Sequence, residues 1–178
     1  MKIKSLVLLF AFALILVGLA GCGRDIISFR DPAEKRREAI SEFIDKDVAV
    51  ETGETYKTEW FEFTIHSIDK VKSYAGYEAK DGNRLYKVLV TEKNIADKAI
   101  PMGSFDFYMD APAFEEYIWA LAPLDDTMMP ESFELEPGEV VQYVMIFEVP
   151  VKTDKLALVY TESYDGGGDG ATFSIPVK

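Results

Sequence analysis

The chain holds one histidine and one cysteine, the residue types that most often carry nucleophilic or metal chemistry. They are His66 and Cys22. A zinc site built from His and Cys needs more of these ligands than the chain has, so the composition excludes such a site. A Ser-His-Asp triad would have to use His66, but no Gly-x-Ser-x-Gly motif accompanies it. His66 follows Ile65 on the polar side of an alternating segment, which indicates a surface histidine on a strand.

Acidic residues form two groups that could hold a cation. Asp165 and Asp169 flank a glycine-rich segment similar to a calcium loop, although Gly and Pro stand where an EF-hand has its third and last ligands. A hairpin loop is the alternative for this segment. Asp125 and Asp126 begin a second acidic stretch, which could equally be a solvated loop. We expect no metal and no cofactor, with Asp165 and Asp169 as the metal candidates.

The first 22 residues have the features of a secretory signal. Lys2 and Lys4 precede an uncharged apolar run, and Leu-Ala-Gly leads into Cys22. The run is shorter than the about 20 apolar residues that a spanning helix needs. The segment resembles the lipobox of bacterial lipoproteins, in which the cysteine becomes the acylated N-terminus. The resemblance implies a signal peptide over residues 1–21 and a lipid anchor, such as palmitate, on the extracytoplasmic face of the cell membrane.

The charge of the chain limits its partners. It has 19 basic and 31 acidic residues, a net charge of −12, and loss of Lys2 and Lys4 with the signal would make it more acidic. Such a surface repels nucleic acid and favours cationic partners. With 9 Tyr, 12 Phe and 2 Trp there is enough apolar area for an ordered domain. No disulfide within the chain is possible, because Cys22 has no partner.

A helix is predicted over residues 32–45, within a tether of residues 22–47. Asp31 can cap it, and Pro32 suits the first helical position. Apolar residues then recur at helical spacing, at Ala39, Ile40, Phe43 and Ile44. The helix could pack on the domain or form a solvated stalk, and the sequence leaves both open.

From residue 48 to residue 178 the apolar period changes to two. A strand turns successive side chains to opposite faces, so each alternating run offers one apolar face. The runs are Phe61, Phe63 and Ile65; Tyr86, Val88 and Val90; Phe105, Phe107 and Met109; Val141, Tyr143, Met145, Phe147 and Val149; Leu156, Leu158 and Tyr160; and Phe173, Ile175 and Val177. Gly- and Pro-containing turns separate them. The pattern predicts one all-β domain, an antiparallel β-sandwich, and the absence of a βαβ rhythm argues against a parallel sheet.

Three motifs, in this order, resemble one family. Residues 51–55 (ETGET) precede the strand at 61–65, a later strand ends at Asn94 before a polar turn, and a Pro-Gly-Glu turn at 137–139 leads to a strand that closes at 147–150 (FEVP). They are similar to the Ig-like, DUF4352-like domains of bacterial lipoproteins, whose fold is similar to an immunoprotective extracellular antigen. The resemblance implies an Ig-like sandwich and brings no catalytic residues.

Residues 111–131 interrupt the alternation. Phe114, Tyr117, Ile118 and Leu121 have the spacing of one helix face, which predicts a short helical insertion. Trp119 would project from the opposite side, where it could bind a partner or pack under the next loop. The candidate binding residues are Trp119, Phe114, Tyr117, Asp125 and Asp126.

Together these features predict a non-catalytic binding or interaction module of the bacterial cell envelope. Its partner would be an envelope protein, a peptide or a glycan. Two alternatives stay open. The chain could be an envelope hydrolase that acts through carboxylates, which a cleft with converging acids would favour. It could also be a structural accessory subunit of a membrane complex.

The lipobox leads to a test of location. A fatty-acid probe should label the wild-type protein, and Cys22→Ala should abolish labelling and processing, because the acyl acceptor is lost. Ser5→Ala, which keeps the lipobox, serves as the control. An unlabelled wild type would contradict the lipobox interpretation.

Overall fold

The computed structural model describes residues 47–113, 117–164 and 168–177. The expected signal, the tether and the predicted helix over 32–45 lie outside these residues, as do Phe114 and Asp165. Within them every regular element is a strand, and no helix is long and apolar enough to cross a membrane. The strands are β1 (Asp47–Ala49), β2 (Thr55–Lys57), β3 (Phe61–Val71), β4 (Ser73–Tyr74), β5 (Tyr77–Glu78), β6 (Asn83–Asn94), β7 (Ile100–Met102), β8 (Phe107–Asp110), β9 (Ile118–Trp119), β10 (Phe133–Leu135), β11 (Val140–Pro150), β12 (Ala157–Tyr164) and β13 (Gly168–Pro176).

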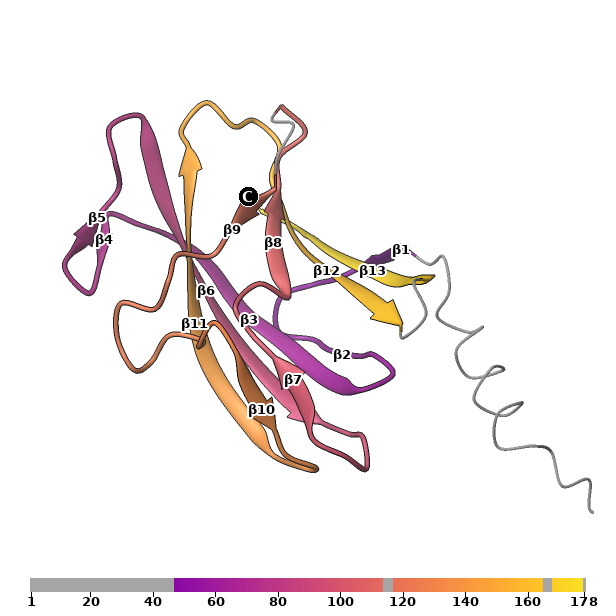
Figure 1. Cartoon of the computed structure of the whole chain (residues 1–178). Helices are drawn as coiled ribbons and strands as arrows, with labels where there is room; N and C mark the ends of the chain where they lie inside the picture. The colour runs from indigo at the N-terminus through magenta and orange to yellow at the C-terminus, as the bar shows by residue number, and fades with distance from the viewer. Residues whose placement is uncertain (1–46, 114–116, 165–167, 178) are drawn as a thin grey trace, which may run out of the picture. The chain divides into compact units, whose positions relative to one another are not determined.

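Two main sheets form a β-sandwich, as the alternation predicts (Figure 1). One has the strand order β11-β6-β3-β2, and the other has the order β1-β13-β12-β8-β9. The pairs β7–β10 and β4–β5 form two small additional sheets. All pairs among these strands are antiparallel, as expected for an antiparallel sandwich, except the parallel pair β1–β13 at one sheet edge. Strand β1 pairs with β13, the last strand, so the two paired strands are far apart in the sequence and no short turn connects them.

The core lies between the inward faces of the two sheets. Phe63 of β3 is at its centre, with ring centroids 5.8 Å from Phe107 of β8 and 5.4 Å from Phe173 of β13. Both contacts are edge-to-face, a favourable geometry for aromatic pairs. Tyr160 of β12 joins them, with its ring centroid 6.0 Å from that of Phe63. The alternating residues of the sequence therefore meet across the sandwich.

A β-bulge at His66 changes the phase of β3. Ile65 pairs with Val90 of β6 and Ser67 with Leu89, so His66 is the extra residue. The bulge keeps Ile68 packed against the core, where strict alternation would turn it outward. His66 is exposed, as expected, and its Nε2 shares a hydrogen bond of 2.8 Å with the Thr91 hydroxyl.

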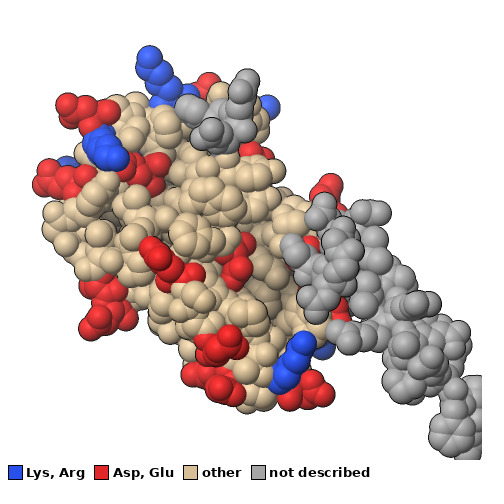
Figure 2. Space-filling view, in the orientation of Figure 1, with Lys and Arg blue, Asp and Glu red and all other residues tan. Residues whose placement is uncertain are grey.

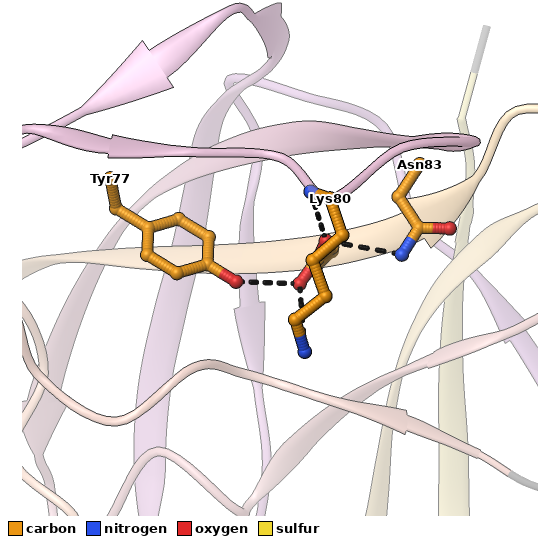
Figure 3. A network of polar contacts seen from close by, with 4 residues as sticks. Tyr77, Lys80 and Asn83 are labelled. Carbon is orange, nitrogen blue, oxygen red and sulfur yellow. Dashed lines mark hydrogen bonds and ion pairs between the residues drawn. The ribbon is translucent and has the colours of Figure 1, made fainter.

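A hairpin of β4 and β5 covers part of the outer face of the β11-β6-β3-β2 sheet. Ala75 and Gly76 both have positive φ, as a tight two-residue hairpin turn requires. Glu148 of β11 anchors the segment that follows β5 (Figure 3): it accepts hydrogen bonds from the Tyr77 hydroxyl and the Lys80 backbone, both 2.7 Å long, and from the Asn83 amide. Burial alone would raise the pKa of Glu148, but these hydrogen bonds hold it below its usual value.

The predicted helical insertion is wrong in the described residues. Ile118 and Trp119 form strand β9, which pairs antiparallel with Met109 and Tyr108 of β8. The chain then crosses to β11, where Ala120 bridges Phe147. A short apolar run fits a helix face and an edge strand equally well, and the free edge of β8 decides between them. In an extended chain Tyr117 and Trp119 share the outer side, and Ile118 packs against the core.

Truncation of Phe147 tests the phase of the core strands. Phe147 is fully buried, so Phe147→Ala should lower the free energy of unfolding by about 3–5 kcal/mol. The exposed control His66→Ala should change it by about 0.5 kcal/mol or less. Urea melts of both variants measure this, and equal effects would contradict the strand phase.

Candidate functional site

Four aromatic rings gather on the outer side of β8 and β9. We call Phe105, Tyr108, Tyr117 and Trp119 the aromatic patch. The exposed fractions of Phe105, Tyr117 and Trp119 are 51%, 56% and 44%. Ring centroids lie 4.3 Å apart for Tyr108 and Tyr117, 5.5 Å for Tyr108 and Trp119, and 6.1 Å for Phe105 and Trp119. Half of the six exposed large apolar residues in the described chain therefore lie in one cluster.

The acidic candidates that the structure describes lie in their own turns and strands. Asp125 is occupied by its own turn, because its Oδ1 accepts hydrogen bonds from the Thr127 backbone at 3.0 Å and hydroxyl at 2.6 Å. These Thr127 hydrogen bonds lower the pKa of Asp125. Asp126 is exposed next to it. Asp169 is the second residue of β13, and the described residues contain no group of three or more acids, His or Cys that could hold a metal.

Acidic residues nevertheless dominate the surface around uncharged areas. Figure 2 shows many acidic and few basic groups on the face drawn, with a broad uncharged area between them. A partner that approaches this face meets uncharged surface within a negative field, as the net charge of −12 predicts.

A cleft of about 260 Å³ lies beside the aromatic patch. Its lining comes from the turn before β3, the β6–β7 loop, β7, the turn before β8, and β12. The lining residues are Trp60, Phe61, Lys98, Ala99, Ile100, Pro101, Met102, Asp106, Tyr160 and Thr161. Thr161 connects the two features, because its hydroxyl lies 3.1 Å from that of Tyr108. The Lys98 ammonium lies 4.9 Å from the centroid of the Trp60 indole.

Two buried polar residues fix the walls of this cleft. The Thr58 hydroxyl accepts hydrogen bonds from the backbone N–H groups of Trp60 and Phe61. Asn94 donates to the carbonyls of Lys98 and Leu135, at 2.9 and 2.7 Å, and so holds the β6–β7 loop against β10. Asn94 is the residue that ends the strand in the family motif. Its structural role explains why the motif places an amide there.

Asp106 is held in the cleft wall by a tight turn. Its Oδ2 accepts a hydrogen bond of 2.7 Å from the Gly103 backbone. A side chain at Gly103 would collide with the backbone carbonyl of Glu131, so this turn requires glycine. Burial raises the pKa of Asp106, and the Gly103 hydrogen bond opposes that rise.

Glu92 is a buried acid that the sequence analysis did not identify. Only 1% of it is exposed, and neither carboxyl oxygen has a hydrogen-bond partner among the described residues. Burial, with a smaller contribution from the negative charge of Asp106, raises its pKa to about 8. The sequence pattern could have indicated its burial, because Glu92 continues the alternation of the inward residues Val88 and Val90 on β6. Glu162 likewise follows Tyr160 inward on β12.

Comparison with family models decides what kind of domain this is. Residues 50–171 match the model described as a domain of unknown function, DUF4352. The chain belongs to the DUF4352 family. The resemblance seen in the motifs is thereby confirmed. No curated protein matches this DUF4352 chain.

Solved structures share the sandwich fold of this DUF4352 domain. A Bacillus subtilis protein described as a candidate lipoprotein (ycdA) is 20% identical with a TM-score of 0.55, over 71% of this chain and 39% of its own. The yjhA protein of Bacillus subtilis is 19% identical with a TM-score of 0.53, over 70% and 98%. The secreted protein MPT63 of Mycobacterium tuberculosis is 9% identical with a TM-score of 0.53, over 72% and 98%. These likenesses show the fold. The DUF4352 chain spans less than half of the ycdA protein.

Glu92 should make the stability of this DUF4352 domain depend on pH. The folded protein keeps a proton on Glu92 that the unfolded chain releases near the ordinary pKa of 4.5. Its contribution is full below about pH 4.5 and is lost as the pH rises to about 8, by at most about 1.4 kcal/mol per pH unit. Glu92→Gln cannot ionise and should flatten this decline.

Urea melts at pH 5, 6, 7 and 8 measure the effect. The matched control is Glu134→Gln, an exposed residue on β10, which should keep the wild-type decline. An unchanged pH slope in Glu92→Gln would contradict the assignment of the raised pKa.

Proposed function

We propose that this protein is a lipid-anchored, non-catalytic binding module on the outside of a bacterial membrane. The aromatic patch carries the proposal, because Phe105, Tyr117 and Trp119 are too exposed to serve the core. Tyr and Trp are enriched in binding hot spots, since a large rigid ring loses little entropy when it is covered. An exposed apolar cluster on a strongly acidic surface is typical of an interaction site.

The location part of the proposal is supported by the lipobox before Cys22. It is also supported by the descriptions of two proteins of similar fold, one as a candidate lipoprotein and one as secreted. A tethered module needs a rigid surface to present, and the patch residues lie on or beside paired strands. Tyr108 pairs with Trp119 in the register of β8 and β9, which fixes the spacing of their rings.

The acidic field points to the kind of partner. Aromatic faces attract cations, and the chain itself places lysines over Tyr74, Tyr86 and Trp60. We therefore expect an envelope protein, peptide or glycan that carries positive or hydroxyl groups. Electrostatic steering would make association faster at low salt.

A hydrolase that acts through carboxylates is the second candidate. Asp106 lines a cleft and has a raised pKa, as a general acid requires. Its neighbour Glu92 also has a raised pKa but does not belong to the lining, so it is not placed to meet a substrate. This pair therefore supports the binding module better than the hydrolase. Hydrolysis of an envelope glycan that Asp106→Asn abolishes would reverse this preference.

Removal of Trp119 tests the proposal. Trp119→Ala should leave the melting midpoint nearly unchanged but weaken partner capture on intact cells by more than about tenfold, the loss of a hot spot. Val140→Ala, which trims another exposed apolar residue, should retain capture. Equal capture by the two variants would contradict the role of the patch.

Fluorescence quenching provides an independent check. In Trp60→Phe, Trp119 is the single tryptophan, because the chain has two. Acrylamide is a neutral quencher and is not repelled by the acidic surface. It should quench Trp119 efficiently, and bound partner should protect it. A blue-shifted, unquenched Trp119 would place the ring in the core instead.

A further inference from the structure

The cleft beside the aromatic patch is a second binding feature with its own chemistry. Its volume of about 260 Å³ is that of several water molecules, at about 30 Å³ each, so it suits a small ligand or a single extended side chain. Its walls are fixed before any ligand arrives, by Thr58 under Trp60 and by Asn94 behind Lys98. A preformed wall lowers the entropy cost of binding.

The lining of this cleft contains one acid, Asp106, and one base, Lys98. Asp106 stands in the lining, and Glu92 lies close enough behind it for the charge of Asp106 to act on its carboxyl group. Glu162 follows the lining residue Thr161 and accepts the Glu59 backbone N–H at 2.7 Å. Asp106 is therefore the carboxylate of the lining, whereas Glu92, which its raised pKa keeps mostly uncharged at neutral pH, and Glu162 lie outside the lining. When Lys98 turns away, the carboxylate of Asp106 favours a cation in its place.

The aromatic walls specify the kind of cation. Trp60 and Tyr160 line the cleft, and the Lys98 ammonium already lies over the indole of Trp60. An alkylammonium on an indole face is a favourable cation–π pair, strongest for Trp. Ile100 and Met102 supply apolar surface for an alkyl chain. No metal-binding group of three or more acids, His or Cys occurs in the part of the chain that the structure describes, so the arrangement suits an organic cation.

We infer that this cleft binds a protonated alkyl amine, with its ammonium group between Asp106 and the ring of Trp60, and that Lys98 is a built-in competitor for the same place. Lys98 extends from a surface loop and is itself exposed, so its side chain can swing out when an external amine enters. The amine can be free or can be the lysine side chain of a peptide. This inference does not depend on the aromatic patch.

Titration of the purified full chain with butylamine tests the inference at pH 7.5, with Trp60 as the reporter. Trp119→Phe is the background, because Trp60 is then the single tryptophan. Butylammonium should change Trp60 fluorescence with saturation. The neutral analogue 1-butanol and the anion butyrate should bind at least tenfold more weakly. Butyrate binding as tight as butylammonium binding would overturn the inference.

Two substitutions should shift the dissociation constant in opposite directions. Lys98→Met removes the internal competitor and should tighten butylammonium binding at least threefold. Asp106→Asn removes the counter-charge and should weaken it at least fivefold. The matched controls are Lys57→Met and Asp97→Asn, exposed residues outside the lining, which should bind like the background protein.

The other possible binding results each decide the question. Weaker binding in Lys98→Met would mean that Lys98 is part of the site for an anion, and the inference would be wrong. Equal dissociation constants in all variants would mean that amines associate with the acidic surface in general, which also overturns it. If Asp106→Asn fails to fold, as judged by circular dichroism, the Lys98→Met result still decides. A lysine-containing tripeptide and its norleucine analogue then show whether a peptide side chain can occupy the cleft.

Discussion

The fold depends on the packing of aromatic rings between two sheets. Burial of apolar surface is the dominant favourable term in folding, and the single cysteine allows no internal disulfide to add to it. Phe63 has ring contacts with residues of both sheets, among them Phe107 and Phe173. Because side chains in a strand alternate, these contacts also determine which residues of β3, β8 and β13 face outward. The outer positions of the aromatic patch follow from the inner positions of the core.

The same alternation places buried polar residues near the cleft. Beyond the apolar centre, β6 continues its inward positions with Glu92 and Asn94, and β12 continues with Glu162. Buried polar groups destabilise the folded state unless they form hydrogen bonds. Asn94 and Glu162 accept or donate backbone hydrogen bonds, whereas Glu92 is kept uncharged by its raised pKa. The buried polar groups near the cleft are thus a direct consequence of β6 and β12 continuing beyond the apolar centre of the core.

The edges of the sandwich show how one segment can serve two purposes. Residues 118 and 119 pair with β8 as strand β9. The residues that follow, up to 129, lie along the outer edge of β11. The Leu121 N–H donates to the Ile146 carbonyl at 2.7 Å, and the Val144 N–H donates to the Thr127 carbonyl at 3.0 Å. This coverage protects an edge that could otherwise pair with another chain. It also brings Trp119 and Tyr117 beside Tyr108, which assembles the patch.

The sequence by itself determined the phase of most strands and the family, but Phe105, expected on the inner face with Phe107, is exposed. The alternation correctly predicts five buried residues, because a strand has two faces and one of them packs away from water. They are Phe61, Phe63, Val88, Val90 and Phe147. The inward position of Glu92 could have been read by extending the same period, since it lies two residues after Val90.

Only the tertiary structure decided the conformation around Trp119 and the assembly of the cleft. A short apolar run is compatible with helix or strand, and the unpaired edge of β8 selects the strand, a contact between segments that local periodicity does not encode. The bulge at His66 and the parallel pairing of β1 with β13 depend in the same way on partners far along the chain. Trp60, Lys98, Asp106 and Tyr160 lie up to 100 residues apart in sequence. They become one site because the two sheets must pack face to face, and that packing is a property of the whole chain.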